Sequence, residues 1–181
     1  MTTPEPIAFR LAVAADALCL GVLSTQVFLD TYATQGVRPA LAREALSQHS
    51  VAVYAALLVD PGVTLLVAEC AGHLVGLSQV IDGAGHAGVP APEASELRRL
   101  YVQERFTGRG VGRELLRHAE KAAAAHGADM LWLTAWQGNA RALQFYPRCG
   151  YDDIGAAIYT IEGEDFPNRL FAKRVRHVAP V

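Results

Sequence analysis

The sequence predicts an α/β fold in which a central sheet is flanked by helices. Several short runs alternate apolar with other residues, which is the period-two pattern of strands. Between them lie runs with apolar residues three to four positions apart, the pattern of amphipathic helices. Because 181 residues suffice for one well-buried core and leave little room for a second, we expect a single domain over residues 1–181.

The first half of the chain is predicted to form a strand, two helices and a hairpin. Apolar residues alternate with others from Ile7 to Val13, and Pro39 precedes the second helix. Ala71-Gly72 is a turn short enough to join two antiparallel strands. The expected elements are a strand at 7–13, helices at 18–28 and 41–56, strands at Val63–Cys70 and His73–Ile81, and a surface loop rich in glycine and proline at 82–92.

The second half begins with a strand, a glycine-rich turn and a helix, in that order. We expect the helix to start at Val111 and to end at Gly127, because glycine suits the residue that follows a helix. The expected elements are a strand at 96–102, this helix, a buried strand at 130–135, a short helix at 139–146 and two closing strands at 151–159 and 169–175.

The charge balance narrows the class of partner. The chain has 16 basic and 18 acidic side chains, for a net charge of −2, and it has no Lys/Arg block. Binding to phosphate backbones or anionic membranes needs a concentrated basic surface. The longest apolar run, at 51–59, is also far shorter than the roughly 18 residues of a membrane span. We therefore expect a small-molecule partner, with no nucleic acid and no membrane.

Cysteine and histidine usage predicts the compartment and argues against a metal. Cys19, Cys70 and Cys149 are odd in number and form no CxxC pair, which favours a reducing compartment, so we expect the protein in the cytoplasm. The six histidines show no metal-ligand spacing. We expect no metal site.

The strongest chemical signal lies between the predicted strand at 96–102 and the helix that follows it. This segment reads Arg105-Phe106-Thr107-Gly108-Arg109-Gly110-Val111-Gly112. Glycines let backbone N–H groups approach an anion closely, and a helix N-terminus adds unpaired donors and the positive end of its dipole. A diphosphate would fit such a loop. A tight turn without a ligand is the alternative interpretation.

Two motifs carry a resemblance to a known family. Arg105-x-x-Gly108-x-Gly110, after Leu100-Tyr101-Val102, resembles the acetyl-CoA signature of the Gcn5-related N-acetyltransferase (GNAT) family. The segment from Asn139 to Tyr146, followed by Gly150-Tyr151, is similar to the family's Asn-x-x-Ala-x-x-Phe-Tyr-x-x-x-Gly-Phe segment. The resemblance covers nearly the whole chain. It implies a mixed, mostly antiparallel sheet flanked by helices and an N-acetyltransferase that uses acetyl-CoA as cosubstrate.

The resemblance also implies which residues bind acetyl-CoA. Backbone amides of the glycine loop would bind the diphosphate, and arginines would add charge-assisted contacts. The strand before the loop would offer main-chain groups to the pantetheine arm and polarise the thioester carbonyl. Asn139 could bond the CoA arm, although asparagine also favours the N-cap of a helix. The candidates are Tyr101, Val102, Arg105, Gly108, Arg109, Gly110, Val111, Gly112, Arg113 and Asn139.

Tyr146 is the candidate general acid. Its phenol is protonated at neutral pH, so it could protonate the departing CoA thiolate after an amine attacks the acetyl carbonyl directly. The alternative is a core residue on the last helix. Pro147 follows at once and could tilt the end of that helix, which would change the direction of the hydroxyl.

Glu96 is the candidate general base, at the start of the strand before the loop. It would deprotonate an ammonium substrate directly or through a water. The alternative is a solvated charge at a strand end, with ordered water as the base.

The acceptor is predicted only as a class. Thr31-Tyr32, the run at 131–136 and the closing segment at 159–173 resemble the PaiA-type polyamine N-acetyltransferases. The resemblance thus implies transfer to a primary amine of a small cationic substrate such as spermidine or spermine, in a ternary complex. The alternatives are an aminoglycoside, an amino acid, a protein N-terminus, or a non-catalytic acyl-CoA-binding sensor. A homodimer is common among similar proteins, and we keep it as a further expectation.

Overall fold

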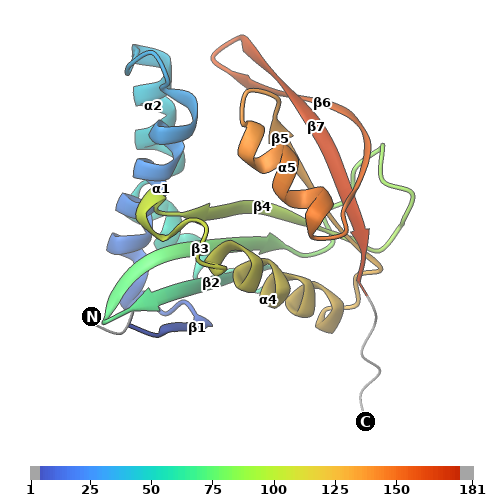
Figure 1. The fold of residues 1–181 in the computed structure, drawn as a ribbon, viewed down its shortest axis with the longest axis horizontal. Helices are drawn as coiled ribbons and strands as arrows, with labels where there is room; N and C mark the ends of the chain where they lie inside the picture. Colours follow the sequence, from blue (N-terminus) through green and yellow to red (C-terminus); the bar gives the residue numbers. More distant parts are fainter. Residues whose placement is uncertain (1–4, 176–181) are drawn as a thin grey trace. The chain divides into compact units, whose positions relative to one another are not determined.

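The structure is a computed structural model that describes residues 5–175. Its strands form a seven-stranded sheet with the order β1-β2-β3-β4-β5-β7-β6 (Figure 1). Most of the described pairs are antiparallel, and β4 and β5 are parallel. This confirms the predicted α/β fold with a mixed, mostly antiparallel sheet. The chain divides into two compact units, each built from two stretches of sequence.

The first unit contains the residues up to Gln79 and Arg99–Ala119. Its sheet pairs β1 with β2 in antiparallel fashion, from Ile7 opposite Cys70 to Leu11 opposite Leu66. Its core joins α1, α3 and the strands through Leu20, Tyr54, Val67 and Leu77. It includes β1 (Ile7–Leu11), η1 (Ala14–Asp16), α1 (Ala17–Tyr32), α2 (Pro39–Gln48), α3 (Val51–Leu57), β2 (Val63–Cys70), most of β3 (His73–Ile81), the end of β4 (Ala94–Val102), η2 (Glu104–Phe106) and the start of α4 (Val111–Ala125).

One predicted helix, at 41–56, is in fact two. α2 ends at Gln48 and α3 begins at Val51. Between them Ser50 has an extended backbone, and its hydroxyl accepts a hydrogen bond from the Val53 N–H at 3.3 Å. Serine is a preferred N-cap because its side chain satisfies a donor of the first turn. The apolar spacing continues across this break, so periodicity alone did not reveal it.

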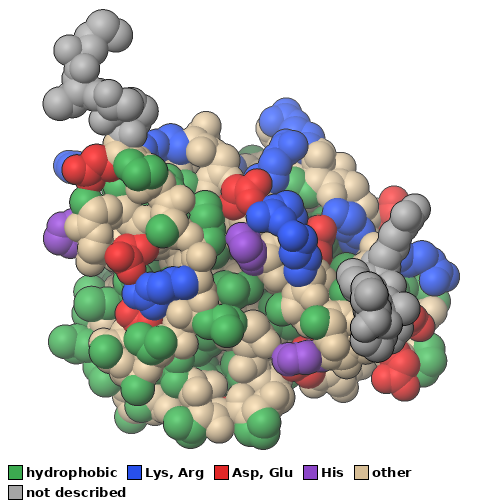
Figure 2. Space-filling view, turned by 90° about the horizontal axis from the view of Figure 1, so that it is seen from below, with side chains coloured by type: hydrophobic (Ala, Val, Ile, Leu, Met, Phe, Trp, Pro, Cys, Tyr) green, Lys and Arg blue, Asp and Glu red, His purple; other side chains and the backbone are tan. Residues whose placement is uncertain are grey.

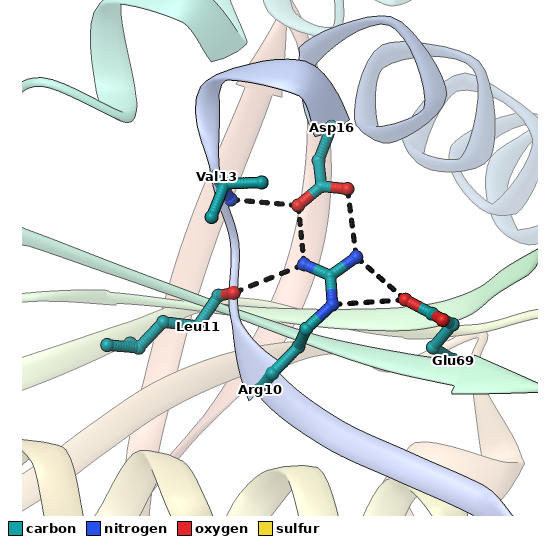
Figure 3. A network of polar contacts seen from close by, with 5 residues as sticks. All are labelled: Arg10, Leu11, Val13, Asp16 and Glu69. Carbon is teal, nitrogen blue, oxygen red and sulfur yellow. Dashed lines mark hydrogen bonds and ion pairs between the residues drawn. The ribbon is translucent and has the colours of Figure 1, made fainter. Parts of the chain in front are cut away.

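An ion-pair network fastens β1 to its neighbours in the first unit (Figure 3). The Arg10 guanidinium donates to both carboxylate oxygens of Asp16, at 2.7 and 3.0 Å, and to Glu69 Oε2 at 2.7 and 3.0 Å. Asp16 also accepts the Val13 N–H at 2.8 Å. Arg10 lowers the pKa of Asp16. The network joins β1, β2 and η1, and so orients α1, which follows η1 directly.

The second unit contains Val80–Arg98 and the residues from Glu120 onward. Within it β7 lies antiparallel to β5 on one side and to β6 on the other, and α5 packs beside β5 and β6 (Figure 1). The core between these strands includes Ala94, Met130, Trp132, Leu170 and Ala172. The elements are the first part of β4, the end of α4, β5 (Met130–Trp136), α5 (Ala140–Arg148), β6 (Asp152–Ile161) and β7 (Glu164–Arg174).

The closing hairpin is longer than the sequence predicted. β7 begins at Glu164 rather than at residue 169, because Glu162 and Gly163 form a two-residue turn directly after β6. Both turn residues have positive φ, 46° and 82°, as the tight turns of twisted hairpins require. The predicted loop at 82–92 is present and is fastened to the sheet, because Trp132 Nε1–H donates to the Ala84 carbonyl at 2.6 Å.

Candidate active site

The glycine loop has the geometry of an anion-binding turn. Gly108 and Gly110 lie at φ 72° and 84°, in the left-handed region that side chains disfavour. No heavy atom lies within 4 Å of a Cβ added at either position, so the backbone faces open space there. α4 begins at Val111, and the N–H groups of its first turn have no acceptor inside the helix. This backbone is compatible with a bound anion, and the diphosphate site stays a prediction.

Three arginines lie in this loop and in the first turn of α4 or just before them. Arg105, Arg109 and Arg113 are all exposed and lie within nine residues of one another. The Arg109 guanidinium sits 5.0 Å from the centre of the Phe106 ring, in the position of a cation–π contact. This contact keeps the positive charge of Arg109 beside the loop. It uses the face of the guanidinium, so the N–H groups at the edge of the guanidinium can turn outward. The arginines can thus supply the charge-assisted contacts that the sequence predicts.

The strand before the loop is tightly held against β3. The Gln103 N–H donates to the Val75 carbonyl at 2.9 Å, just beyond the end of β4. A Cβ added to Gly76 would lie 2.9 Å from the Tyr101 carbonyl oxygen, closer than real Cβ contacts. Glycine at position 76 thus allows the two backbones their close approach. It fixes the main chain at Tyr101 and Val102, the residues assigned to the pantetheine arm.

Tyr146 lies on α5 and is largely buried, with 8% of its surface exposed. Its ring packs against the rings of Phe145, Tyr151 and Phe171, with centroids 5.2, 5.8 and 5.7 Å away. Three aromatic neighbours define the orientation of the phenol. The packing is compatible with both predicted roles of this residue, the general acid and the core residue.

Pro147 does not end the helix at Tyr146. α5 continues to Arg148, and the Cys149 N–H donates to the Phe145 carbonyl at 3.2 Å. The proline thus lies inside the last turn, and the backbone of Tyr146 is helical. At the other end Asn139 is the N-cap, and its side-chain oxygen accepts the Ala142 N–H at 3.1 Å. The capping role of Asn139 is confirmed, and its side-chain NH₂ keeps two donors for a ligand.

Glu96 is a buried, paired carboxylate rather than a solvated charge. The residue is 9% exposed, and its two carboxylate oxygens accept hydrogen bonds from Arg98 Nε and Nη2 at 2.8 and 2.6 Å. Residues two apart on a strand share a face, which brings the two side chains together. The reading of Glu96 as a solvated strand-end charge is wrong, and Arg98 is a site neighbour that the sequence analysis missed.

Glu96 also marks the end of a ladder. β4 and β5 pair in parallel from Ala94 opposite Met130 to Glu96 opposite Trp132. β5 continues to Trp136 and β4 continues past Glu96. Beyond the Glu96–Trp132 pair, the backbone N–H and C=O groups of β4 and β5 therefore take no part in the described β4–β5 ladder.

The candidate residues fall into two groups. The first unit holds the loop and the strand end, from Tyr101 to Arg113. The second unit holds Glu96, Asn139 and Tyr146.

Over residues 5–175, no group of three His, Cys, Asp or Glu side chains is placed to hold a metal ion. No helix in this range is long and apolar enough to cross a membrane. On the face shown in Figure 2, acidic side chains lie next to basic ones, as the near-neutral composition suggests.

The fold is that of solved N-acetyltransferases. Residues 30–151 match the acetyltransferase (GNAT) family. The chain belongs to this family and is an acetyl-CoA-dependent N-acetyltransferase, which confirms the prediction from the two sequence motifs.

Known proteins similar to this chain agree with the family. An uncharacterised N-acetyltransferase of Mycobacterium tuberculosis is 30% identical over 112 residues, which is 62% of this chain and 67% of that protein. The PaiA N-acetyltransferase of Thermoplasma acidophilum, solved in complex with coenzyme A, has a TM-score of 0.72 at 21% identity and covers 93% of this chain and 99% of its own. The yncA structure of Salmonella typhimurium, with its cofactor acetyl-CoA, has a TM-score of 0.70 at 20% identity, covering 98% and 99%. At these identities the two structures establish the fold.

Proposed function

We propose that this enzyme transfers the acetyl group of acetyl-CoA to the primary amine of a small molecule by direct attack in a ternary complex. The observation that carries the proposal is the loop at Gly108 and Gly110, which has left-handed backbone, open space and a helix N-terminus behind it. Such a loop binds a diphosphate through backbone N–H groups without contacting the reacting atoms. The reaction therefore needs further residues to act on the acetyl group.

The protein's own groups would have two roles in this part of the reaction, which are to bind the diphosphate and to polarise the thioester carbonyl. Of the N–H groups from Phe106 to Arg113, those from Gly108 onward would bind the diphosphate, because the Phe106 and Thr107 N–H groups donate to the Gln103 and Glu104 carbonyls. Arg105, Arg109 or Arg113 would add charge. When bound, acetyl-CoA supplies an activated thioester, and main-chain groups of Tyr101 and Val102 polarise its carbonyl. Such contacts are worth a few kcal/mol when they tighten in the transition state.

Proton transfers complete the reaction. The attacking nitrogen must first lose a proton, either to Glu96 or to water. A new C–N bond then forms as the C–S bond breaks, and the Tyr146 phenol gives its proton to the leaving sulfur. The nitrogen loses its second proton to the phenolate or to water, which leaves a neutral amide and CoA thiol. Each Glu96 oxygen accepts one hydrogen bond from Arg98 and keeps its other lone pair. We therefore favour proton transfer from the amine to Glu96 through an ordered water over direct transfer.

The acceptor is proposed only by class. Spermidine and spermine come first because the sequence resembles PaiA-type enzymes and the fold resembles the Thermoplasma acidophilum PaiA structure. An aminoglycoside, an amino acid and a protein N-terminus are the other amine acceptors. A binding module without turnover would keep the same loop.

The test is acetyl-CoA-dependent release of CoA across a panel of spermidine, spermine, aminoglycosides, amino acids and peptides. Mass detection of the acetylated product avoids interference from Cys19, Cys70 and Cys149. Turnover with one class of amine supports the proposal and names its acceptor. CoA binding without turnover of any amine would contradict it and favour a sensor.

A further inference from the structure

A buried polar cluster in the first unit is not used by the chemistry above. It gathers side chains from α1, α3, the α2–α3 junction, β3 and β4. The Tyr54 hydroxyl donates to Ser24 Oγ at 2.7 Å, and Ser24 Oγ shares a hydrogen bond of 2.6 Å with His49 Nδ1. Ser24, His49, Tyr54 and Gln79 are each at most 4% exposed. The cluster is therefore an ordered interior feature.

Arg99 brings a positive charge to this cluster. Its Nη1 donates to Gln79 Oε1, and its Nη2 donates to the Gln48 carbonyl at 3.3 Å. Both acceptors are neutral, and no ion pair to Arg99 occurs among residues 5–175. A guanidinium has five N–H donors in a planar fork that matches a carboxylate. The side chain is thus held in place at one end, with donors left for an anion.

The surrounding groups do not neutralise this charge. Burial, with a smaller effect of Arg99, lowers the pKa of His49 to about 3, so His49 is neutral. Burial raises the pKa of Tyr101 and Tyr32, the latter to about 12, so both phenols are neutral as well. The charge of Glu44 adds a smaller, raising effect on the pKa of Tyr32. A half-buried cation among neutral groups favours the binding of an anion.

The position of Arg99 relates it to the reaction. Arg99 and Tyr101 are two residues apart on β4, so they share one face and lie about 6.6 Å apart along the strand. The charge of Arg99 also acts on Tyr101, because it lowers the pKa of this phenol against the larger, raising effect of burial. Tyr101 is the residue whose main chain is proposed to hold the thioester. An anion on Arg99 would therefore lie a few bonds away from the reacting amine of the same small molecule.

We propose that Arg99, positioned by Gln79, binds the carboxylate of the acceptor, so that the acceptor is an amino acid or another small amine that carries a carboxylate. This inference rests on the proposed function and narrows it, because it puts an amine that carries a carboxylate in place of the polyamines as the preferred acceptor. Arg99 would repel a polyamine and attract the negative end of an amino acid. The uncharged side chains of Ser24, His49 and Tyr54 would lie behind the guanidinium.

The test compares pairs of acceptors that differ only in charge. Each proteinogenic L-amino acid is assayed against its carboxamide, with spermidine alongside. For the preferred amino acid we expect kcat/KM to exceed that of its amide by about 10- to 100-fold, the usual effect of a hydrogen bond to a charged group. Arg99→Gln should reduce this ratio to near one, and Arg99→Lys should keep part of it. Arg117→Gln, which removes an exposed arginine of the same unit, should leave the ratio unchanged.

A binding measurement separates this inference from the proposed function. Calorimetric titration of the amino acids into the protein with CoA should show binding that Arg99→Gln abolishes, whether or not turnover occurs. Absence of turnover together with Arg99-dependent binding would contradict only the proposed function. Efficient turnover of amides or spermidine, unaffected by Arg99→Gln, would overturn the carboxylate site and leave the proposed function standing. No binding of any amino acid to the wild type, with no preference for the acid form, would also overturn it.

Discussion

Arg98 forms two hydrogen bonds with Glu96, because its Nε and Nη2 donate to the two carboxylate oxygens at 2.8 and 2.6 Å. The partners differ in exposure, because the Glu96 side chain is 12% exposed and that of Arg98 is 51% exposed. The pair raises the pKa of Arg98. Arg98 therefore pairs with a largely buried carboxylate at the point where the β4–β5 ladder ends.

Replacing Arg98 should destabilise the protein through Glu96. Arg98→Gln leaves a nearly buried carboxylate without its cation. We expect the free energy of unfolding to fall by about 1 kcal/mol, a value reduced from that of a fully buried pair because Arg98 is half exposed. Urea denaturation at pH 7 measures the change. Arg169→Gln breaks a pair exposed on both sides, with Asp153, and should have a smaller effect; equal losses in the two variants would contradict this view of Glu96.

Removing the hydroxyl of Tyr146 should slow turnover without weakening acetyl-CoA binding. We expect Tyr146→Phe to lower kcat by about 100-fold, the lower end of the range for general-acid catalysis. The ring contacts with Phe145, Tyr151 and Phe171 do not involve the hydroxyl, so the fold should persist. Steady-state kinetics and calorimetric titration with acetyl-CoA measure the two effects. Tyr151→Phe is the matched control and should keep kcat; full activity of Tyr146→Phe with normal binding would mean that Tyr146 is a core residue only.

Two glycines allow backbone strain to be separated from ligand binding. Gly110 in the loop and Gly72 in the β2–β3 turn both have positive φ, 84° and 78°, and a Cβ at either meets nothing within 4 Å. Alanine at each should therefore cost a similar amount of stability, about 1 kcal/mol. Only Gly110→Ala should raise the KM for acetyl-CoA, because the methyl group occupies the space that a diphosphate needs. An equal rise in Gly72→Ala would indicate a general loss of folding rather than a loop contact.

The sequence was informative where local rules decide the structure. The bounds of β2 and β3 match the prediction. The two-residue turn Ala71-Gly72 fixes the end of β2 and the start of β3. The loop at Gly108 and Gly110 could be predicted because glycine spacing records the backbone conformation directly. The break at Ser50 could not be predicted, because the apolar spacing continues across it. The start of β7 at Glu164 could not be predicted either, because polar residues and Pro167 interrupt the alternation of apolar residues there.

The charged part of the site was harder to predict. Arg98 and Arg99 are neighbours in the sequence and look like two solvated charges on one strand. In the structure they lie on opposite faces, where Arg98 meets Glu96 and Arg99 meets Gln79, which is 20 positions away. Alternation predicts that their faces differ. Only the tertiary fold shows which partner each face provides.

The buried histidine should give the protein a characteristic acid sensitivity. His49 is 4% exposed, and burial followed by the charge of Arg99 lowers its pKa to about 3 from 6.5. Below pH 6.5 the unfolded chain takes up a proton at this position while the folded chain does not. Stability is therefore complete above pH 6.5 and is lost as the pH falls toward 3, by about 1.4 kcal/mol per pH unit over the steep part.

The slope, rather than the absolute stability, identifies His49 as the cause. Urea denaturation of the wild type between pH 7 and pH 4.5 should show the decline, and His49→Gln should flatten it even if this variant is less stable at pH 7. His73→Gln, which replaces an exposed histidine in the same unit, should keep the wild-type slope. A decline of the same steepness in His49→Gln would assign the acid sensitivity to other groups. It would also mean that His49 accepts a proton in the folded state beside Arg99. The side chains of Ser24, His49 and Tyr54 would then not be the uncharged neighbours on which the carboxylate site depends.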